Sequence, residues 1–214
     1  MTTNHPASQT ATTTVEPGLS PDDPRLAFAK AVALGGTVVA AVRPDQMELP
    51  TPCESMNVGQ LFGHLIGAFQ RLAAAARGDE DPFGGSFHPI VTTVAADQWS
   101  DAWTEVAHEV QAAWTDPALL AAMITLPFAT LPGAVVLGIY TSEVTVHTWD
   151  LAKATGQHPA WDDEVVASAL AVMRIGLPAE PRGGEFPFGA VVPVPANAPL
   201  IDQLVAWNGR DPRM

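Results

Sequence analysis

The sequence predicts an all-α protein, a bundle of helices followed by a C-terminal segment of mixed character. Apolar residues recur at helical spacing in several long segments, and Pro and Gly gather between these segments. Hydrophobic residues make up 47% of the chain and charged residues 15%, which is a globular balance. A length of 214 residues favours one domain that can bury a core without disulfides.

The first helix is expected to begin at the acidic pair before Pro24 and to end near Pro44. Residues 1–23 are rich in Thr, Ser and Pro and carry almost no large apolar side chains. They cannot bury enough surface to offset the entropy of ordering. We therefore expect a disordered arm in front of a single domain at 24–214.

The second helix is expected from about 57 to 77, where apolar residues form a clear helical stripe and Gly78 suits the C-terminal cap. The stretch 78–95 is rich in Gly and Pro. Connections of this length in compact domains tend to be crossovers or covers of a site. A third helix is expected at about 96–114, with tryptophans at helical spacing.

No charged residue occurs in the 26 residues at 117–142, which raises the question of a membrane span. Pro127 and Pro132 interrupt the stretch, so a buried core segment is the better interpretation. A fourth helix is expected from about 133 to 154, closed by Gly156.

The fifth helix is expected at 161–176, with acidic residues that complement the helix dipole in its first turn. Residues 178–199 are rich in Pro and Gly, and 188–194 is a candidate short extended piece. A last short helix is expected at 199–207.

The charge and cysteine content exclude several classes of function. Lys and Arg number 10 against 23 Asp and Glu, a net charge of −13 that argues against nucleic acid or an anionic membrane as partner. Cys53 is the single cysteine, so an intramolecular disulfide and cysteine-cluster metal sites are excluded. The N-terminus lacks the features of a signal peptide, and we expect a cytoplasmic protein.

The sharpest chemical feature is Glu143 with His147. At i and i+4 the two lie on one helix face, and a Glu and a His at this spacing suit a metal ion. Glu143 follows the long uncharged stretch, where an unpaired carboxylate would be costly. A hydrogen-bonded pair on a helix surface remains the alternative. Asp150 either orients His147 from behind or is a surface charge beside Lys153.

His64 is the candidate third ligand. It lies off the apolar stripe of its helix, and its small neighbours leave room for another element and a ligand cavity. An exposed helical histidine remains the alternative. The other histidines are expected in the arm, in loops beside prolines or on a solvated helix face: His5, His88, His108 and His158.

Other catalytic patterns are absent from the sequence. It contains no H-E-x-x-H, no pair of E-x-x-H motifs, no G-x-S-x-G, no P-loop and no G-x-G-x-x-G. Cys53 stands in a proline-bounded turn before a helix, and we expect it to be structural and not the nucleophile.

Three segments resemble actinobacterial DinB-like metal-binding proteins: TPCESMNVGQLFGHLIG at 51–67, LPGAVVLGIYTSEVTVHTWDLAKATGQ at 131–157 and APLIDQLVAWNGRDP at 198–212. These proteins are similar to the N-terminal domain of mycothiol-dependent maleylpyruvate isomerase. The resemblance implies a DinB/YfiT-like four-helix bundle with a long crossover between helices 2 and 3, here followed by an extra C-terminal helix and a short tail.

The resemblance also implies a metal site at His64, Glu143 and His147. Two histidines and one carboxylate suit zinc with an open position, and they also suit iron. The resemblance favours zinc or nickel, with mycothiol as the thiol that the open position would bind as a thiolate. Met56 stands near a place where the family has Trp, so one wall of the pocket is expected to differ.

The implied function is that of a thiol-dependent transferase or isomerase acting on a small electrophile. The isomerase has a further C-terminal domain that supplies a catalytic arginine, and none of Arg182, Arg210 and Arg213 lies in a matching motif. Two alternatives therefore stay open. One is a non-catalytic metal-containing module that binds a small ligand or serves in stress, and the other is a helical module that forms a homodimer around a vestigial site.

Overall fold

A computed structural model describes residues 19–20, 22–86, 88–95, 97–183 and 188–214. Most of the expected arm at 1–23 lies outside the described residues. The chain forms six helices, two 3-10 turns and one hairpin in this order: α1 (Pro24–Ala40), η1 (Pro44–Gln46), α2 (Val58–Arg77), α3 (Trp99–Ala113), η2 (Pro117–Leu120), β1 (Met123–Leu126), β2 (Ala129–Pro132), α4 (Gly133–Thr155), α5 (Asp163–Gly176) and α6 (Leu200–Trp207).

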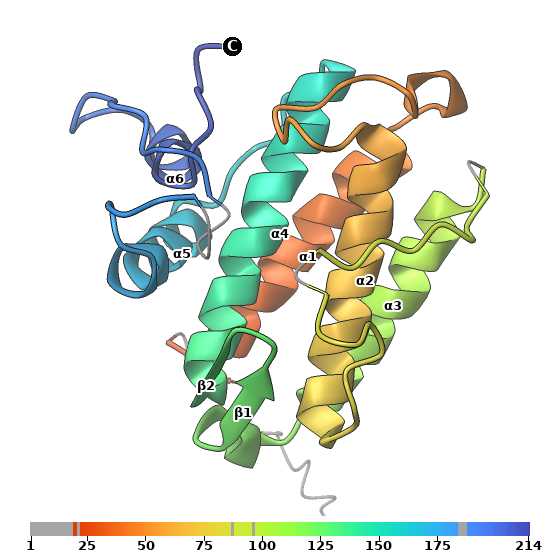
Figure 1. Cartoon of the computed structure of the whole chain (residues 1–214), viewed down its shortest axis with the longest axis vertical. Coiled ribbons are helices and arrows are strands. Elements are labelled where there is room, and N and C mark those ends of the chain that lie inside the picture. Colours follow the sequence, from red (N-terminus) through yellow and green to blue (C-terminus); the bar gives the residue numbers. More distant parts are fainter. Residues whose placement is uncertain (1–18, 21, 87, 96, 184–187) are drawn as a thin grey trace, which may run out of the picture.

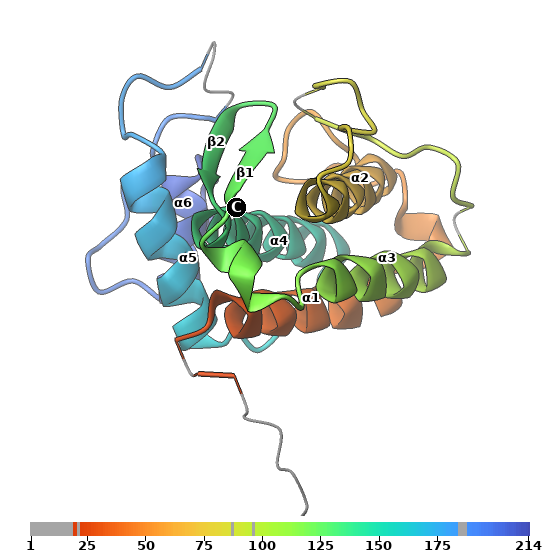
Figure 2. The same cartoon turned by 90° about the horizontal axis from the view of Figure 1, so that it is seen from below.

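Helices α1 to α4 form a four-helix bundle, as the sequence predicts. α1 packs on α3 and α4, and α2 packs on the same two helices. The connection from α2 to α3 runs back along the length of α2, so it is the expected crossover (Figure 1). Seen along the bundle, α5 and α6 lie beside α4, outside the four-helix layer (Figure 2).

Two apolar clusters hold these helices together. The larger one lies within the bundle, and a second one joins α4 to α5 and α6. The second cluster contains Val146 and Trp149 of α4 together with Leu170 and Leu204. Because α4 contributes to both clusters, its polar residues are fixed from two sides.

Side-chain caps and glycines set the helix ends where the sequence predicts them. Asp23, Asn57 and Asp162 each accept a hydrogen bond from a backbone N–H in the first turn of α1, α2 and α5. Gly78 and Gly156 end α2 and α4 in the left-handed region, with φ of 72° and 71°.

The segment 117–132 differs from the expected buried core segment. It forms η2 and an antiparallel hairpin in which Met123 pairs with Pro132 and Leu126 with Ala129. Pro127 and the residue after it form the turn. The strand alternates, so Leu126 is buried while Met123 is 61% exposed. A short apolar run does not by itself distinguish a strand from a core segment.

The tail is irregular, as expected. Residues 188–194, all of them described, form no strand; the Val192 N–H donates to the Ala206 carbonyl, and Phe188 packs against the cluster to which α6 contributes. Beyond α6 the chain returns to α4, where Lys153 Nζ donates to the carbonyls of Pro212 (3.1 Å) and Met214 (2.7 Å).

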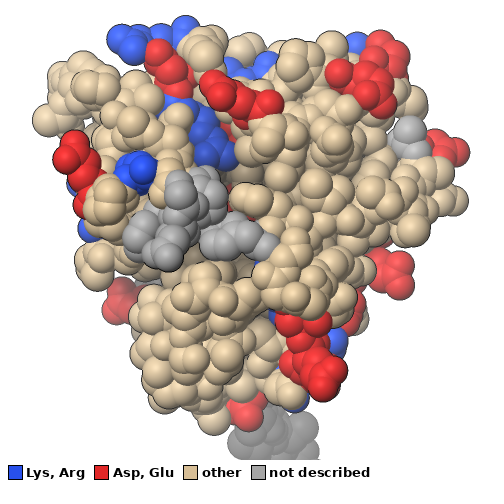
Figure 3. All heavy atoms as spheres, viewed as in Figure 1, with Lys and Arg blue, Asp and Glu red and all other residues tan. Residues whose placement is uncertain are grey.

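Within the described residues, every helix is too short or too polar to cross a bilayer. Acidic side chains are spread around the rim of the face in Figure 3. Some basic side chains lie deeper, in the furrow between the two halves of that face (Figure 3).

Candidate metal centre

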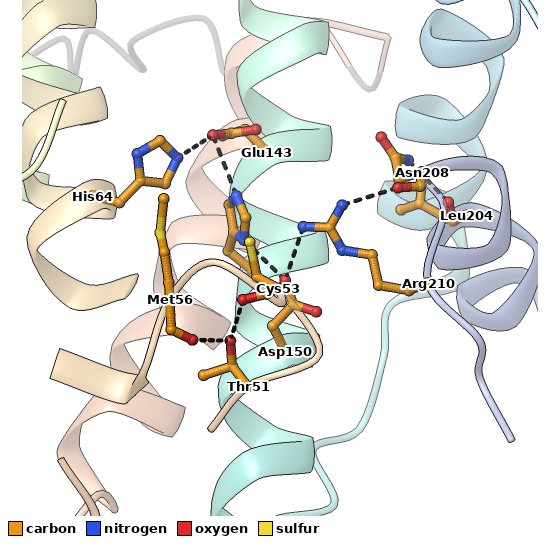
Figure 4. A network of polar contacts seen from close by, with 10 residues as sticks. Thr51, Cys53, Met56, His64, Glu143, Asp150, Leu204, Asn208 and Arg210 are labelled. Atoms are coloured by element: carbon orange, nitrogen blue, oxygen red, sulfur yellow. Dashed lines mark hydrogen bonds and ion pairs between the residues drawn. The ribbon is translucent and has the colours of Figure 1, made fainter. Parts of the chain in front are cut away.

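Two helices bring the three expected ligands together. His64 comes from α2, and Glu143 and His147 come from α4 (Figure 4). His64 Nε2 lies 2.8 Å from Glu143 Oε1, and His147 Nε2 lies 3.4 Å from the same oxygen. The two imidazole rings stand edge to face with their centroids 5.1 Å apart. Three donor atoms therefore converge on one point between the helices.

His64 is buried, with 3% of its surface exposed, although it lies off the apolar stripe of its helix. The crossover connection covers it and supplies the Pro89 carbonyl, 3.1 Å from His64 Nδ1. A Cβ on Gly67 would lie 2.9 Å from Pro89, so the small residue permits this close approach. The alternative of an exposed helical histidine is wrong.

His147 is oriented in the same way by Asp150. The Nδ1 atom of His147 lies 2.9 Å from Asp150 Oδ2, and the Asp150 side chain is completely buried. Asp150 therefore stands behind His147 and is not a surface charge. Each ring has Nδ1 against an acceptor, which leaves Nε2 directed at Glu143.

In the absence of a metal ion, the charges at the site favour an ion pair between the Glu143 carboxylate and a protonated His147. Burial alone would raise the pKa of Glu143, but the charge of His147 and the hydrogen bonds from both imidazoles hold that pKa well below its usual range. Burial alone would lower the pKa of His147, but Glu143 and Asp150 raise it to about 10. A proton on His147 thus occupies the place that a cation would take.

The donor set fits a divalent ion. The three ligand atoms all lie within 4.8 Å of one another. Ligands about 2.1 Å from a tetrahedral zinc ion stand roughly 3.4 Å apart, and the two Nε2 atoms lie 2.8 and 3.4 Å from Glu143 Oε1. The Glu143 side chain is 29% exposed, so the centre opens toward solvent on that side. Two imidazoles and one carboxylate would leave a position open to water or a ligand.

The turn before α2 forms the floor of the site. Thr51 Oγ1 donates to the Met56 carbonyl at 2.7 Å and lies 3.1 Å from the Cys53 carbonyl. Met56 is 6% exposed, and its thioether end points toward His64 in Figure 4. This is the place expected for a pocket wall.

Three further residues, Cys53, His88 and Arg210, lie near the centre although their sequence patterns do not place them there. The donor atoms of Cys53, His147 and Asp150 lie within 4.8 Å of one another, so Cys53 borders the site. The ring of His88, on the crossover, lies 5.7 Å from that of His64, and burial and His64 lower the pKa of His88. The position of Cys53 in the turn at 51–56 was the available signal.

Arg210 is the third such residue. It follows α6, and its Nη2 donates to Asp150 Oδ2 at 3.2 Å (Figure 4). Burial alone would lower the pKa of Arg210, but the Asp150 carboxylate more than compensates and raises it. The contact joins positions 60 residues apart, and no sequence period could indicate it.

The sequence is similar to known proteins over most of its length. Residues 28–152 match the model of the family described as "Mycothiol maleylpyruvate isomerase N-terminal domain". Two uncharacterized proteins of Mycobacterium tuberculosis, from strains CDC 1551 / Oshkosh and ATCC 25618 / H37Rv, are each 35% identical over 191 residues. These alignments cover 89% of this chain and 100% of each relative.

Solved structures share the fold. A crystal structure of the mycothiol-dependent maleylpyruvate isomerase superposes with a TM-score of 0.55 at 13% identity, and a variant of that enzyme gives 0.55 at 12%. Each similarity covers 72% of this chain and 68% of the solved one. At this identity the likeness establishes the DinB-like helical fold.

Proposed function

Because the chain belongs to the mycothiol maleylpyruvate isomerase N-terminal domain family, we propose that it binds one divalent metal ion through His64, Glu143 and His147. The ion would present an open position to a low-molecular-weight thiol. Mycothiol is the thiol that the family name points to. The resulting activity is transfer of the thiol to a small electrophile, or isomerisation through such an adduct.

One observation carries this proposal. Two Nε2 atoms and one carboxylate oxygen converge, while both Nδ1 atoms face fixed acceptors, Pro89 O and Asp150 Oδ2. Holding the rings in this way orients them for a cation. Zinc and nickel suit the set best, and iron is the further candidate.

The bound ion would supply Lewis acidity, which lowers the pKa of a thiol so that it is a nucleophile at neutral pH. The protein's own part is orientation and access. Pro89 and Asp150 fix the two rings, and the exposed edge of Glu143 leaves the approach for a thiol. Cys53 and Met56 lie beside the proposed ligands, and we expect them to contact a bound thiol.

A second candidate is a non-catalytic module that uses the same ion to bind a small ligand. The structural match covers 68% of the isomerase chain and 72% of this one at 13% identity, so it supports a shared fold and not a shared reaction. In either case we expect residues 24–214 to act as one domain. Light scattering would show whether the protein forms a homodimer.

Cobalt substitution tests the proposal. Addition of mycothiol to the cobalt protein should give a sulfur-to-metal charge-transfer band. Glu143→Gln keeps the shape of the side chain and removes the anionic ligand, so metal affinity should fall while the helix content is retained. Glu105→Gln, at an exposed site on α3, is the matched control and should behave like the wild type.

Two results would decide against parts of the proposal. A wild-type protein that binds no divalent ion after reconstitution would remove the metal centre. If the cobalt protein shows no spectral change at millimolar mycothiol, the thiol-dependent reaction is rejected and the non-catalytic binding module takes its place.

A further inference from the structure

Arg210 places a buried positive charge directly behind the metal centre. Its side chain is 13% exposed, and its Nη1 donates to the Asn208 carbonyl at 2.9 Å. Its Nη2 donates to Asp150 Oδ2, the oxygen that also faces His147 Nδ1. Burial of a guanidinium is costly, so this arrangement calls for an explanation.

The simplest explanation for the buried Arg210 is that it holds the C-terminal segment against α4, but the segment does not depend on this contact. The segment has other attachments: the Arg210 N–H donates to the Val205 carbonyl, and Lys153 donates to the carbonyls of Pro212 and Met214. Asp150 Oδ2, in contrast, contacts His147 and Arg210, and Asp150 Oδ1 has no hydrogen-bond partner among the described residues. Asp150 therefore depends on Arg210 more than the segment does.

The two contacts on Asp150 Oδ2 fix the direction of the hydrogen bonds. A guanidinium can only donate, so Oδ2 is held as an acceptor at a set position. In the neutral imidazole that would bind a metal, the hydrogen must then lie on His147 Nδ1, and the lone pair lies on Nε2. A carboxylate without Arg210 could rotate about its side chain and leave Nδ1 without its acceptor.

We propose that Arg210 is a positioning residue that acts through Asp150 to hold His147 ready for the metal ion. The inference rests on the proposed metal centre. It also means that docking of the segment at 208–214 on α4 and binding of the ion favour each other.

Charge alone predicts the opposite effect. Arg210 is a cation close to the place of another cation, so removing it would tighten metal binding if only Coulomb repulsion mattered. Positioning predicts weaker binding instead. The sign of the change in affinity therefore separates the two explanations.

The experiment compares Arg210→Met, Arg210→Lys and Arg213→Met for zinc affinity and for the spectrum of the cobalt form. Arg213 is an exposed arginine of the same segment, with a side chain 73% exposed, and serves as the control. We expect Arg210→Met to weaken zinc binding about 10- to 100-fold. Arg210→Lys should recover most of this loss, and Arg213→Met should change nothing. Unchanged or tighter binding by Arg210→Met would overturn the inference.

A double variant tests whether Arg210 acts through Asp150. If it does, Arg210→Met should cost little further affinity in an Asp150→Asn background, whereas independent effects would multiply. The double variant also removes the unpaired buried charge, so it covers the case in which Arg210→Met alone fails to fold. Multiplying effects would contradict the proposal.

A measurement on the metal-free protein keeps this inference separate from the metal centre itself. The hydrogen-bonded Nδ1–H of His147 should give a protected side-chain NMR signal in the wild type and in Arg213→Met, and the signal should disappear in Arg210→Met. If the wild type binds no ion, the proposed function is wrong. If the NMR signal persists in Arg210→Met, only the positioning role of Arg210 is wrong.

Discussion

His64 Nε2 lies 2.8 Å from Glu143 Oε1, although the two residues are 79 positions apart and stand on different helices. The contact exists because α2 and α4 both present polar side chains to one narrow space under the crossover. The three side chains therefore already lie together in the structure without an ion.

Replacement of His147 should remove metal binding. Purified protein should hold about one divalent ion per chain, and His147→Ala should lose it because one of three protein ligands is gone. His108→Ala, at an exposed histidine of α3, is the control and should keep the ion. Elemental analysis checks this, and full occupancy of His147→Ala would contradict it.

The stability of the metal-free protein should fall as pH rises from 7 to 9. The pKa of His147 is raised from 6.5 to about 10, so its contribution is complete below pH 6.5 and is lost toward pH 10. The pKa of Glu143 lies below 4.5, so its contribution is lost only in acid. Urea unfolding at a series of pH values measures this change.

Two comparisons sharpen the pH experiment. Metal-free His147→Ala should lose the slope between pH 7 and 9. With zinc present the dependence should reverse, because the ion displaces the proton from His147 and binds more tightly as that proton becomes easier to remove. Equal slopes for the wild type and His147→Ala would show that another group is responsible.

Cys53→Ser should retain metal binding and thiol binding. Cys53 lies with His147 and Asp150, and the three converging donors of the proposed centre do not include it. We therefore expect Cys53 to shape the pocket and not to act as the nucleophile. Complete loss of binding, with the circular dichroism spectrum unchanged, would refute this.

Removal of residues 1–20 should change the melting temperature little. This stretch carries almost no large apolar side chains with which to dock on a helical bundle. Differential scanning calorimetry of the shortened protein measures the effect. A decrease of many degrees would mean that the arm packs on the bundle or on a second subunit.

Gly35→Ala should destabilise the bundle by about 1–3 kcal/mol. A Cβ at this position would lie 2.7 Å from the indole of Trp103, where α1 meets α3. Gly176→Ala is the matched control, because a Cβ there meets nothing within 4 Å. Chemical denaturation of both variants tests the difference, and equal stability would show that Trp103 can move aside.

The sequence predicts those parts of the fold that depend on local chemistry. The helical period and the cap residues, such as Gly78 and Gly156, indicate the helices to within a few residues. The hairpin was missed because a short apolar run interrupted by Pro127 fits either a strand or a core segment. The contact of Arg210 with Asp150 could not be predicted, because it depends on how α6 packs on α4.

The close passage of the crossover over α2 limits how the centre could be transplanted. His64 Nδ1 faces the Pro89 carbonyl. The loop can pass this close because a Cβ on Gly67 would meet Pro89, and a Cβ on Gly63 would meet Ile90 and Val91. Three ligand side chains transferred to another four-helix scaffold would lack the loop that covers His64. A transplanted site would need the glycine pair, the loop through Pro89 and the part of α4 that carries Glu143 and His147, so the smallest portable unit is two helices with the loop that covers one of them.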